Sequence, residues 1–181
     1  MKSVVYIFLM LSSPLLCQAQ WLTGIGSKWN DSFTEWALFT EEDELEGNLE
    51  IRWKRQFDWT VWDYQLGDER GSIKLSFPND PSQWVIRGTD EVVTARTRWI
   101  NDFREWRITN NSITLVFKSR WKNDFNEWML DDDRFGEFVV VTEWKDDPRE
   151  WQIIDELNET IGMTMKMAMV FIAIYHSSPK Q

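Results

Sequence analysis

One histidine, one cysteine and 30 Asp and Glu residues are the side chains of this 181-residue sequence from which catalytic chemistry could be built. His176 has no cysteine and no evident acidic partner near it in sequence, so we interpret it as an ordinary surface residue. The sequence has no G-x-S-x-G, no H-E-x-x-H, no phosphate-binding glycine loop and no zinc-ligand spacing. Nothing in the sequence singles out two of the carboxylates as the catalytic pair that a glycosidase requires. We therefore expect a protein that is not an enzyme and that has no cofactor and no metal site.

A repeated glutamate is the second feature that could indicate function. It stands directly before a tryptophan at four places, Glu35, Glu105, Glu127 and Glu150. In a β-hairpin such a side chain points outward and lies diagonal to a cation such as Lys28, Arg98 or Arg120. Exposed pairs of this kind contribute a few tenths of a kcal/mol and keep the surface soluble. We interpret the glutamates as surface ion-pair partners.

The charge balance is acidic, with 20 Lys and Arg against 30 Asp and Glu. A nucleic-acid binder needs a basic face to neutralise phosphates, so we expect no nucleic-acid partner. Acidic runs lie at residues 41–44, 68–69, 90–91, 131–133 and 155–156. They lack the fixed spacing of a calcium loop and are interpreted as a solvated acidic rim.

The N-terminus has the features of a signal peptide. Lys2 precedes a mostly apolar segment, and small residues near position 19 predict cleavage after Ala19. A lipoprotein would use Cys17, but Leu16 before it is large. Residues 1–19 are therefore predicted to be removed, which leaves residues 20–181 as one domain without cysteine. Such a chain fits a bacterial periplasm, cell surface or extracellular space better than a disulfide-rich secreted eukaryotic domain.

An internal repeat of about 23 residues organises the rest of the chain. The segment WNDSFTEW at residues 29–36 recurs as WINDFREW at 99–106, WKNDFNEW at 121–128 and WKDDPREW at 144–151. A weaker copy begins at residue 77 and a degenerate one at residue 53. Apolar and polar residues alternate before each copy, and Asn-Asp supplies a turn, so each repeat is predicted to be a β-hairpin.

The alternation separates two faces. Both tryptophans of a repeat fall on an uncharged face, and a reversal about residues 102 and 103 would set Trp99 opposite Trp106. The other face carries Lys28, Arg52, Lys74, Arg96, Arg98, Arg107, Lys118 and Arg120. The sequence thus predicts an all-β fold of six tandem β-hairpin repeats in an antiparallel meander, ending in a strand over residues 161–175. We expect a closed or flattened barrel with a Trp-rich interior and a backbone radius of roughly 10 Å, with a sandwich as the second choice.

Two surfaces are candidates for a partner or ligand. Trp59 takes the place of the repeated glutamate, and alternation sends it outward beside Arg52 and Lys54, where it could stack on a sugar ring or anchor a partner. Alternatively, a longer loop in this repeat tucks Trp59 away.

The second surface is an apolar patch on the outer face of the last strands. Its members are Val139, Val141, Ile154, Val170, Ile172 and Ile174. An exposed patch of this kind favours a homodimer or an envelope protein partner. Alternatively, the N-terminal segment 21–25 or a long loop covers it.

These features favour an exported, non-enzymatic β-repeat protein of the bacterial cell envelope that acts as a binding or structural module. A carbohydrate or an apolar small molecule could be its ligand. The alternatives are a small barrel that holds an apolar ligand in a Trp-lined lumen, and a small outer-membrane β-barrel. The latter is disfavoured because seven-residue strands are short for a lipid-facing band about 25 Å tall.

Overall fold

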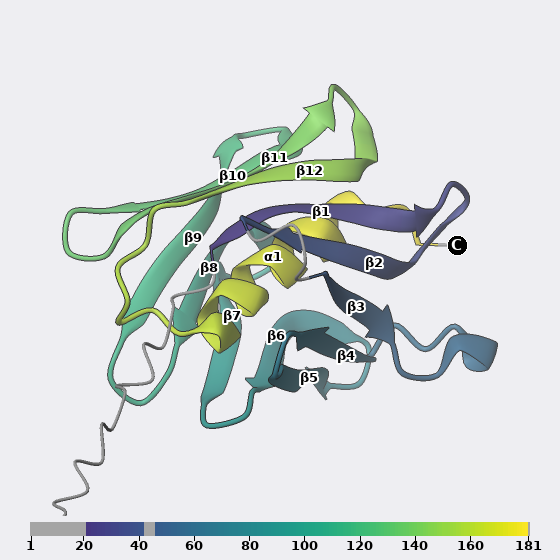
Figure 1. The fold of residues 1–181 in the computed structure, drawn as a ribbon, viewed down its shortest axis with the longest axis horizontal. Helices are drawn as coiled ribbons and strands as arrows, with labels where there is room; N and C mark the ends of the chain where they lie inside the picture. The colour runs from purple at the N-terminus through teal and green to yellow at the C-terminus, as the bar shows by residue number, and fades with distance from the viewer. Residues whose placement is uncertain (1–20, 42–45, 181) are drawn as a thin grey trace, which may run out of the picture.

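The computed structural model describes residues 21–41 and 46–180 and shows a closed barrel of twelve antiparallel strands (Figure 1). Each strand pairs with its neighbours in sequence, and β1 pairs with β12 to close the barrel. The strands are β1 (Leu22–Trp29), β2 (Ser32–Thr40), β3 (Gly47–Ile51), β4 (Val61–Leu66), β5 (Glu69–Phe77), β6 (Asp80–Arg87), β7 (Val92–Trp99), β8 (Asp102–Thr109), β9 (Thr114–Trp121), β10 (Asp124–Asp132), β11 (Gly136–Trp144) and β12 (Asp147–Asp155). The predicted meander barrel is confirmed, and the sandwich is not formed. The predicted signal peptide, residues 1–19 with Cys17, lies outside the described residues.

Five of the six hairpins reverse direction earlier than the sequence suggested; the exception is β3–β4, which has a longer loop. Trp99 pairs with Asp102, which leaves a two-residue turn, and Asn101 in this turn has a left-handed φ of 60°. A bulge follows in β8, so that Trp106 pairs with Thr97. The prediction that Trp99 opposes Trp106 is therefore wrong. Asn and Asp tolerate the left-handed conformation better than most residues, which explains why this pair recurs at the turns.

The second tryptophan of every repeat lies inside the barrel, as predicted. The six side chains are at most 3% exposed, and they are Trp36, Trp62, Trp84, Trp106, Trp128 and Trp151. Each indole N–H donates to the backbone carbonyl three residues earlier at 2.8–3.1 Å. A buried indole needs such a partner, and a carbonyl is available whether the residue is phenylalanine or proline. Two repeats can therefore have proline, Pro81 and Pro148, at the position where another repeat has Phe103.

The interior also holds a helix, α1 (Met163–Ser177), which runs through the barrel (Figure 1). The prediction of a closing strand over residues 161–175 is wrong. The segment contains four methionines and two alanines, which favour helix, and residues 164–175 are buried on every side. Fifteen residues of helix span about 22 Å and have a diameter of about 10–12 Å. A helix of this size fills space that tryptophans on a twelve-stranded wall leave open.

Polar contacts fix α1 at both ends of the barrel. Lys166 forms a buried ion pair with Asp155 at 2.7 Å, and Asp155 also accepts the Leu22 amide at 3.2 Å. At the other end, the Ser177 hydroxyl donates to the Phe125 carbonyl at 2.8 Å. Gly88 allows the helix to approach, because a Cβ there would lie 2.0 Å from the Thr164 hydroxyl oxygen.

Candidate binding surface at the hairpin tips

The first aromatic residue of every repeat lies outside the barrel, at the end where the hairpin turns are. The six side chains are 52–63% exposed, and they are Trp29, Trp53, Phe77, Trp99, Trp121 and Trp144. We call this set the aromatic rim. Its members were expected in the core together with the second tryptophans. Five of them stand at hairpin turns where a bulge shifts the register between the two strands, whereas Trp53 precedes the short helix at residues 54–56 in the loop between β3 and β4.

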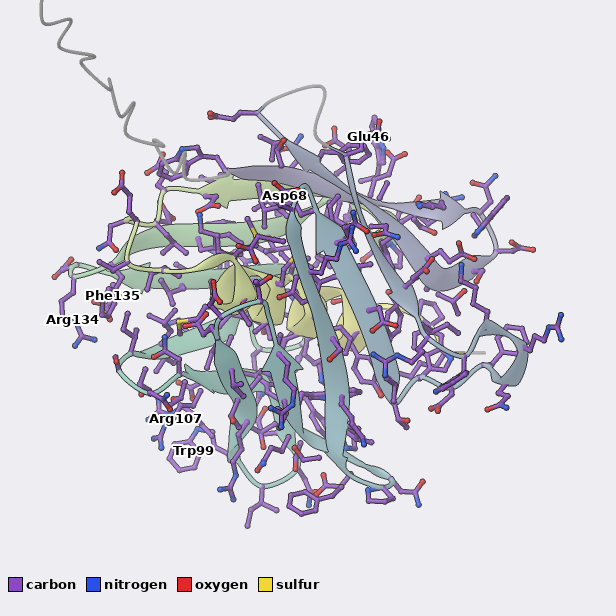
Figure 2. The ribbon with its side chains drawn as sticks, turned by 60° about the horizontal axis from the view of Figure 1, so that its bottom comes forward. Glu46, Asp68, Trp99, Arg107, Arg134 and Phe135 are labelled. Atoms are coloured by element: carbon purple, nitrogen blue, oxygen red, sulfur yellow. The ribbon has the colours of Figure 1, made fainter. Side chains whose placement is uncertain are left out.

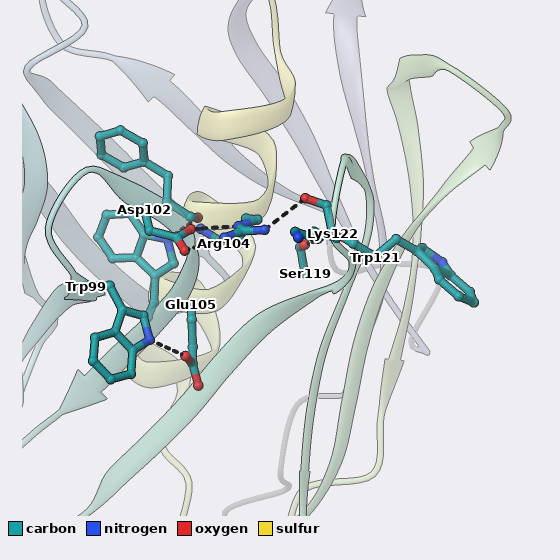
Figure 3. Close-up of polar contacts among 9 residues, drawn as sticks. Trp99, Asp102, Arg104, Glu105, Ser119, Trp121 and Lys122 are labelled. Carbon is teal, nitrogen blue, oxygen red and sulfur yellow. Dashed lines mark hydrogen bonds and ion pairs between the residues drawn. The ribbon is translucent and has the colours of Figure 1, made fainter.

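Trp99 and Trp121 are held in place by polar neighbours. The Trp99 indole N–H donates to Glu105 Oε2 at 2.9 Å (Figure 3). Arg98 Nη1 donates to Glu105 Oε1 at 2.6 Å. The Arg98 guanidinium lies 5.6 Å from the centre of the Trp99 ring. Trp121 repeats the arrangement, with its N–H donating to Glu127 at 3.0 Å and Arg120 bonded to the same carboxylate.

These contacts explain the repeated glutamate. Glu105 and Glu127 form the expected ion pairs, but each also accepts from an exposed indole. Glu35 pairs with Lys54 at 3.0 Å rather than with Lys28. In the sequence the glutamate follows the first tryptophan of the repeat by six residues. A tight turn followed by a bulge brings these two side chains together.

Two grooves flank Trp99. The first has a volume of about 470 Å³ and is lined by Asp80 and Ser82 of β6, Arg96 and Arg98 of β7, and Arg107 of β8. We call it the arginine groove. The second, of about 410 Å³, lies between Trp99 and Trp121, and its floor includes Lys118 and Ser119.

Arg104 links the hairpins on either side of the second groove. It donates to the Lys122 carbonyl at 3.2 Å and forms a two-pronged contact with Asp102 (Figure 3). Its hydrogen bond lowers the pKa of Asp102 to about 2, so this carboxylate is ionised at neutral pH. The Arg104–Asp102 ion pair thus forms part of the lining of the second groove.

Trp59 does not lie outward as alternation predicted. The loop between β3 and β4 contains the short helix η1 (Lys54–Gln56), and it places Trp59 over the end of the barrel, 5.4 Å from Trp62 and 6.3 Å from Tyr175 between ring centres. Trp59 is partly buried and lines a pocket of about 390 Å³ with Lys54 and Trp29. Arg52 pairs with Asp63 on β4 instead.

The predicted apolar patch is divided by the barrel wall. Val139 and Ile154 pair across β11 and β12, and Val141 follows at the next outward position of β11. Val170, Ile172 and Ile174 belong to α1 and are at most 1% exposed inside the barrel. The six residues therefore form no common outer surface, because the last of them are in a helix and not in a strand.

His176 is not a surface residue. Its ring packs on Phe103 at 4.9 Å and on Trp106 at 5.1 Å between centres, at the end of α1. Burial, and to a smaller extent the charge of Lys180, lowers the pKa of His176 to about 3. The imidazole is therefore neutral at physiological pH.

Within residues 21–41 and 46–180, no group of three or more His, Cys, Asp or Glu side chains is placed to hold a metal ion. No helix there has the length and hydropathy needed to cross a membrane. The chain matches no family model, no curated protein sequence and no solved structure.

Proposed function

We propose that the protein is an exported, non-enzymatic binding module of the bacterial cell envelope, and that the aromatic rim binds carbohydrate. The observation that carries the proposal is the fixed orientation of the exposed indoles of Trp99 and Trp121. A sugar ring stacks on the face of an aromatic side chain, and a side chain already held in place loses little conformational entropy on binding. The carboxylates, guanidiniums and hydroxyls beside the indoles are suitable partners for sugar hydroxyls.

The repeat supports a polymeric ligand. Strands in a sheet are about 4.8 Å apart, so equivalent positions on neighbouring hairpins are separated by about 10 Å. This distance is comparable with the length of a disaccharide in an extended chain. Neighbouring sites that hold one polymer reinforce each other through effective concentration, even where each site alone is weak.

An apolar ligand inside the barrel receives less support. The lumen that such a ligand would need contains α1, whose residues 164–175 are buried. The outer face of the barrel carries ion pairs such as Arg98–Glu105 and Arg52–Asp63, which suits an aqueous surface better than lipid. We therefore place the ligand at the hairpin tips.

The test is a double variant, Trp99→Ala with Trp121→Ala, measured against a panel of soluble and insoluble polysaccharides. We expect at least a tenfold loss of binding, because stacking on each indole contributes on the order of 1 kcal/mol and the two sites act together. The matched control is Phe135→Ala. Phe135 also lies under an arginine, Arg134 at 4.9 Å, but away from the rim (Figure 2).

The control variant is expected to bind as the parent protein does. If no polysaccharide binds the parent, or if the double variant binds unchanged, the proposed function is wrong.

A further inference from the structure

The basic residues of this acidic protein are gathered on one part of the barrel. The five neighbouring strands β5 to β9 carry nine Lys and Arg against four Asp and Glu, whereas the whole chain has 20 against 30. Eight of the nine side chains are exposed, and they are Arg70, Lys74, Arg87, Arg96, Arg98, Arg107, Lys118 and Arg120. We call this surface the basic face. Since the protein as a whole is negative, this concentration of positive charge indicates a negatively charged partner.

Two arginines at the centre of the basic face are placed directly opposite each other. Arg96 on β7 and Arg107 on β8 are partners in the strand register. Like charges at such positions destabilise a sheet. Among the described residues, neither guanidinium has a hydrogen bond or ion pair with another side chain, whereas Arg98 is bonded to Glu105. The free donors of Arg96 and Arg107 are therefore available to a ligand.

Both arginines line the arginine groove together with Trp99, and Figure 2 shows Trp99 and Arg107 projecting side by side. A guanidinium binds a carboxylate through two parallel hydrogen bonds, and an indole face receives a sugar ring. The groove volume of about 470 Å³ is within the range of small-ligand sites. We propose that the arginine groove binds the carboxylates of an anionic glycan, such as a polymer of uronic acids. This proposal rests on the proposed function.

The charge distribution favours a polyuronate over a nucleic acid. Double-stranded DNA carries one negative charge per about 1.7 Å of axis and binds mainly through many phosphate contacts. Here two guanidiniums of the groove, those of Arg96 and Arg107, have no hydrogen bond or ion pair with another described side chain, and the acidic remainder of the protein repels a densely charged polymer. A uronic-acid chain has at most one charge per sugar ring, so one carboxylate can bind between the arginines while its ring lies on Trp99.

The experiment compares polygalacturonate with its methyl-esterified form, which has the same backbone without the charges, by isothermal titration at about 0.15 M salt. We expect the parent protein to bind the free acid at least tenfold more tightly than the ester. Arg96→Gln with Arg107→Gln is expected to remove about tenfold of this affinity, because each charged hydrogen bond is strong. The matched control, Arg70→Gln with Lys74→Gln, changes the net charge equally on the same face and is expected to bind within about twofold to threefold of the parent.

The outcomes separate the two proposals. Equal binding of the acid and the ester, lost in Trp99→Ala, would overturn the anionic ligand and leave carbohydrate binding standing. Absence of binding to either form and to every polysaccharide of the panel would overturn both. Single-stranded DNA and anionic lipid vesicles serve as further probes. The inference is wrong if either probe binds as tightly as polygalacturonate and if the groove variant (Arg96→Gln with Arg107→Gln) and its charge control weaken binding equally. The basic face would then be a non-selective polyanion surface.

Discussion

At the scale of single residues, each repeat uses tryptophan in two opposite ways. Trp106 is fully buried and bonded to a backbone carbonyl, whereas Trp99 is 57% exposed and bonded to Glu105. The two side chains are seven positions apart in the same motif. The inward residue fills the core, and the outward residue presents a rigid flat surface. The difference leads to opposite expectations for stability and for binding.

Trp106→Ala is expected to lower the free energy of unfolding by about 3–5 kcal/mol, because it leaves a cavity in a packed core. Trp99→Ala is expected to change it by less than about 1 kcal/mol, since the lost contacts are exposed. Urea denaturation of the two variants measures both values. Equal destabilisation would contradict the assignment of one tryptophan to the core and one to the rim.

His176 predicts a dependence of stability on pH. In the unfolded chain its pKa is near 6.5, whereas burial lowers the pKa to about 3 in the folded protein. Between these values the unfolded state binds a proton that the folded state does not, so stability falls as the pH is lowered below 6.5. The slope is about 1.4 kcal/mol per pH unit, which amounts to about 2 kcal/mol between pH 7 and pH 5.

Urea denaturation at about pH 7, 6 and 5 tests the role of His176, with His176→Phe as the comparison. Phenylalanine keeps the stack on Phe103 without a titrating group, so we expect the variant to lose most of the slope. The pKa values of Asp102 and Asp132 are also lowered, to about 2, by hydrogen bonds from arginine, but these groups affect stability mainly below about pH 4. Identical slopes in the variant and the parent would show that His176 does not control acid stability.

At the scale of elements, the barrel and α1 depend on each other. The twelve strands form the wall, and the helix supplies buried side chains such as Phe171, which packs edge-on against Trp84 at 4.8 Å. One ion pair, Lys166–Asp155, joins the helix to β12 in a region without solvent access. Removing one member of a buried pair leaves the other charge without compensation.

Lys166→Met and Asp155→Asn are each expected to lower the free energy of unfolding by about 3–5 kcal/mol. The double variant is expected to regain a large part of this loss, because neither charge remains buried. Asp155 is replaced by asparagine because the side-chain oxygen of asparagine can still accept a hydrogen bond from the Leu22 amide. A double-mutant cycle by chemical denaturation gives the coupling between the two residues. Additive losses would mean that the two side chains stabilise the protein independently.

At the scale of the whole molecule, the closed sheet depends on an element that fills its interior. A chain that ends before α1 would leave β5 to β8 and β10 without the helix that packs against them. We expect deletion of residues 162–181 to give a state that binds a hydrophobic dye and lacks near-ultraviolet circular dichroism, as loosely packed states do. Addition of α1 as a separate peptide is expected to restore the signal. A truncated chain with the parent's cooperative melting would contradict the role of the helix.

The sequence by itself determined the hairpins, their number and the two faces of their strands. These features depend on local spacing, since side chains alternate along a strand and Asn-Asp favours a turn wherever it occurs. The same local information placed the second tryptophans inside and the cations of β5 to β9 outside. It also indicated most members of the basic face but not Arg70 and Arg87, and the significance of the set needed the neighbouring strands to be placed side by side.

Only the tertiary structure decided where the first tryptophans and the last segment lie. Trp99 reaches the outside because a bulge shifts the register between β7 and β8, and a bulge follows from the pairing of two strands rather than from either strand alone. Residues 161–175 are apolar almost throughout, so their periodicity does not separate a buried strand from a buried helix, although their length and their methionine and alanine content favour helix. Closure of twelve strands creates an interior that needs a filling element, and that requirement exists only once the barrel is formed.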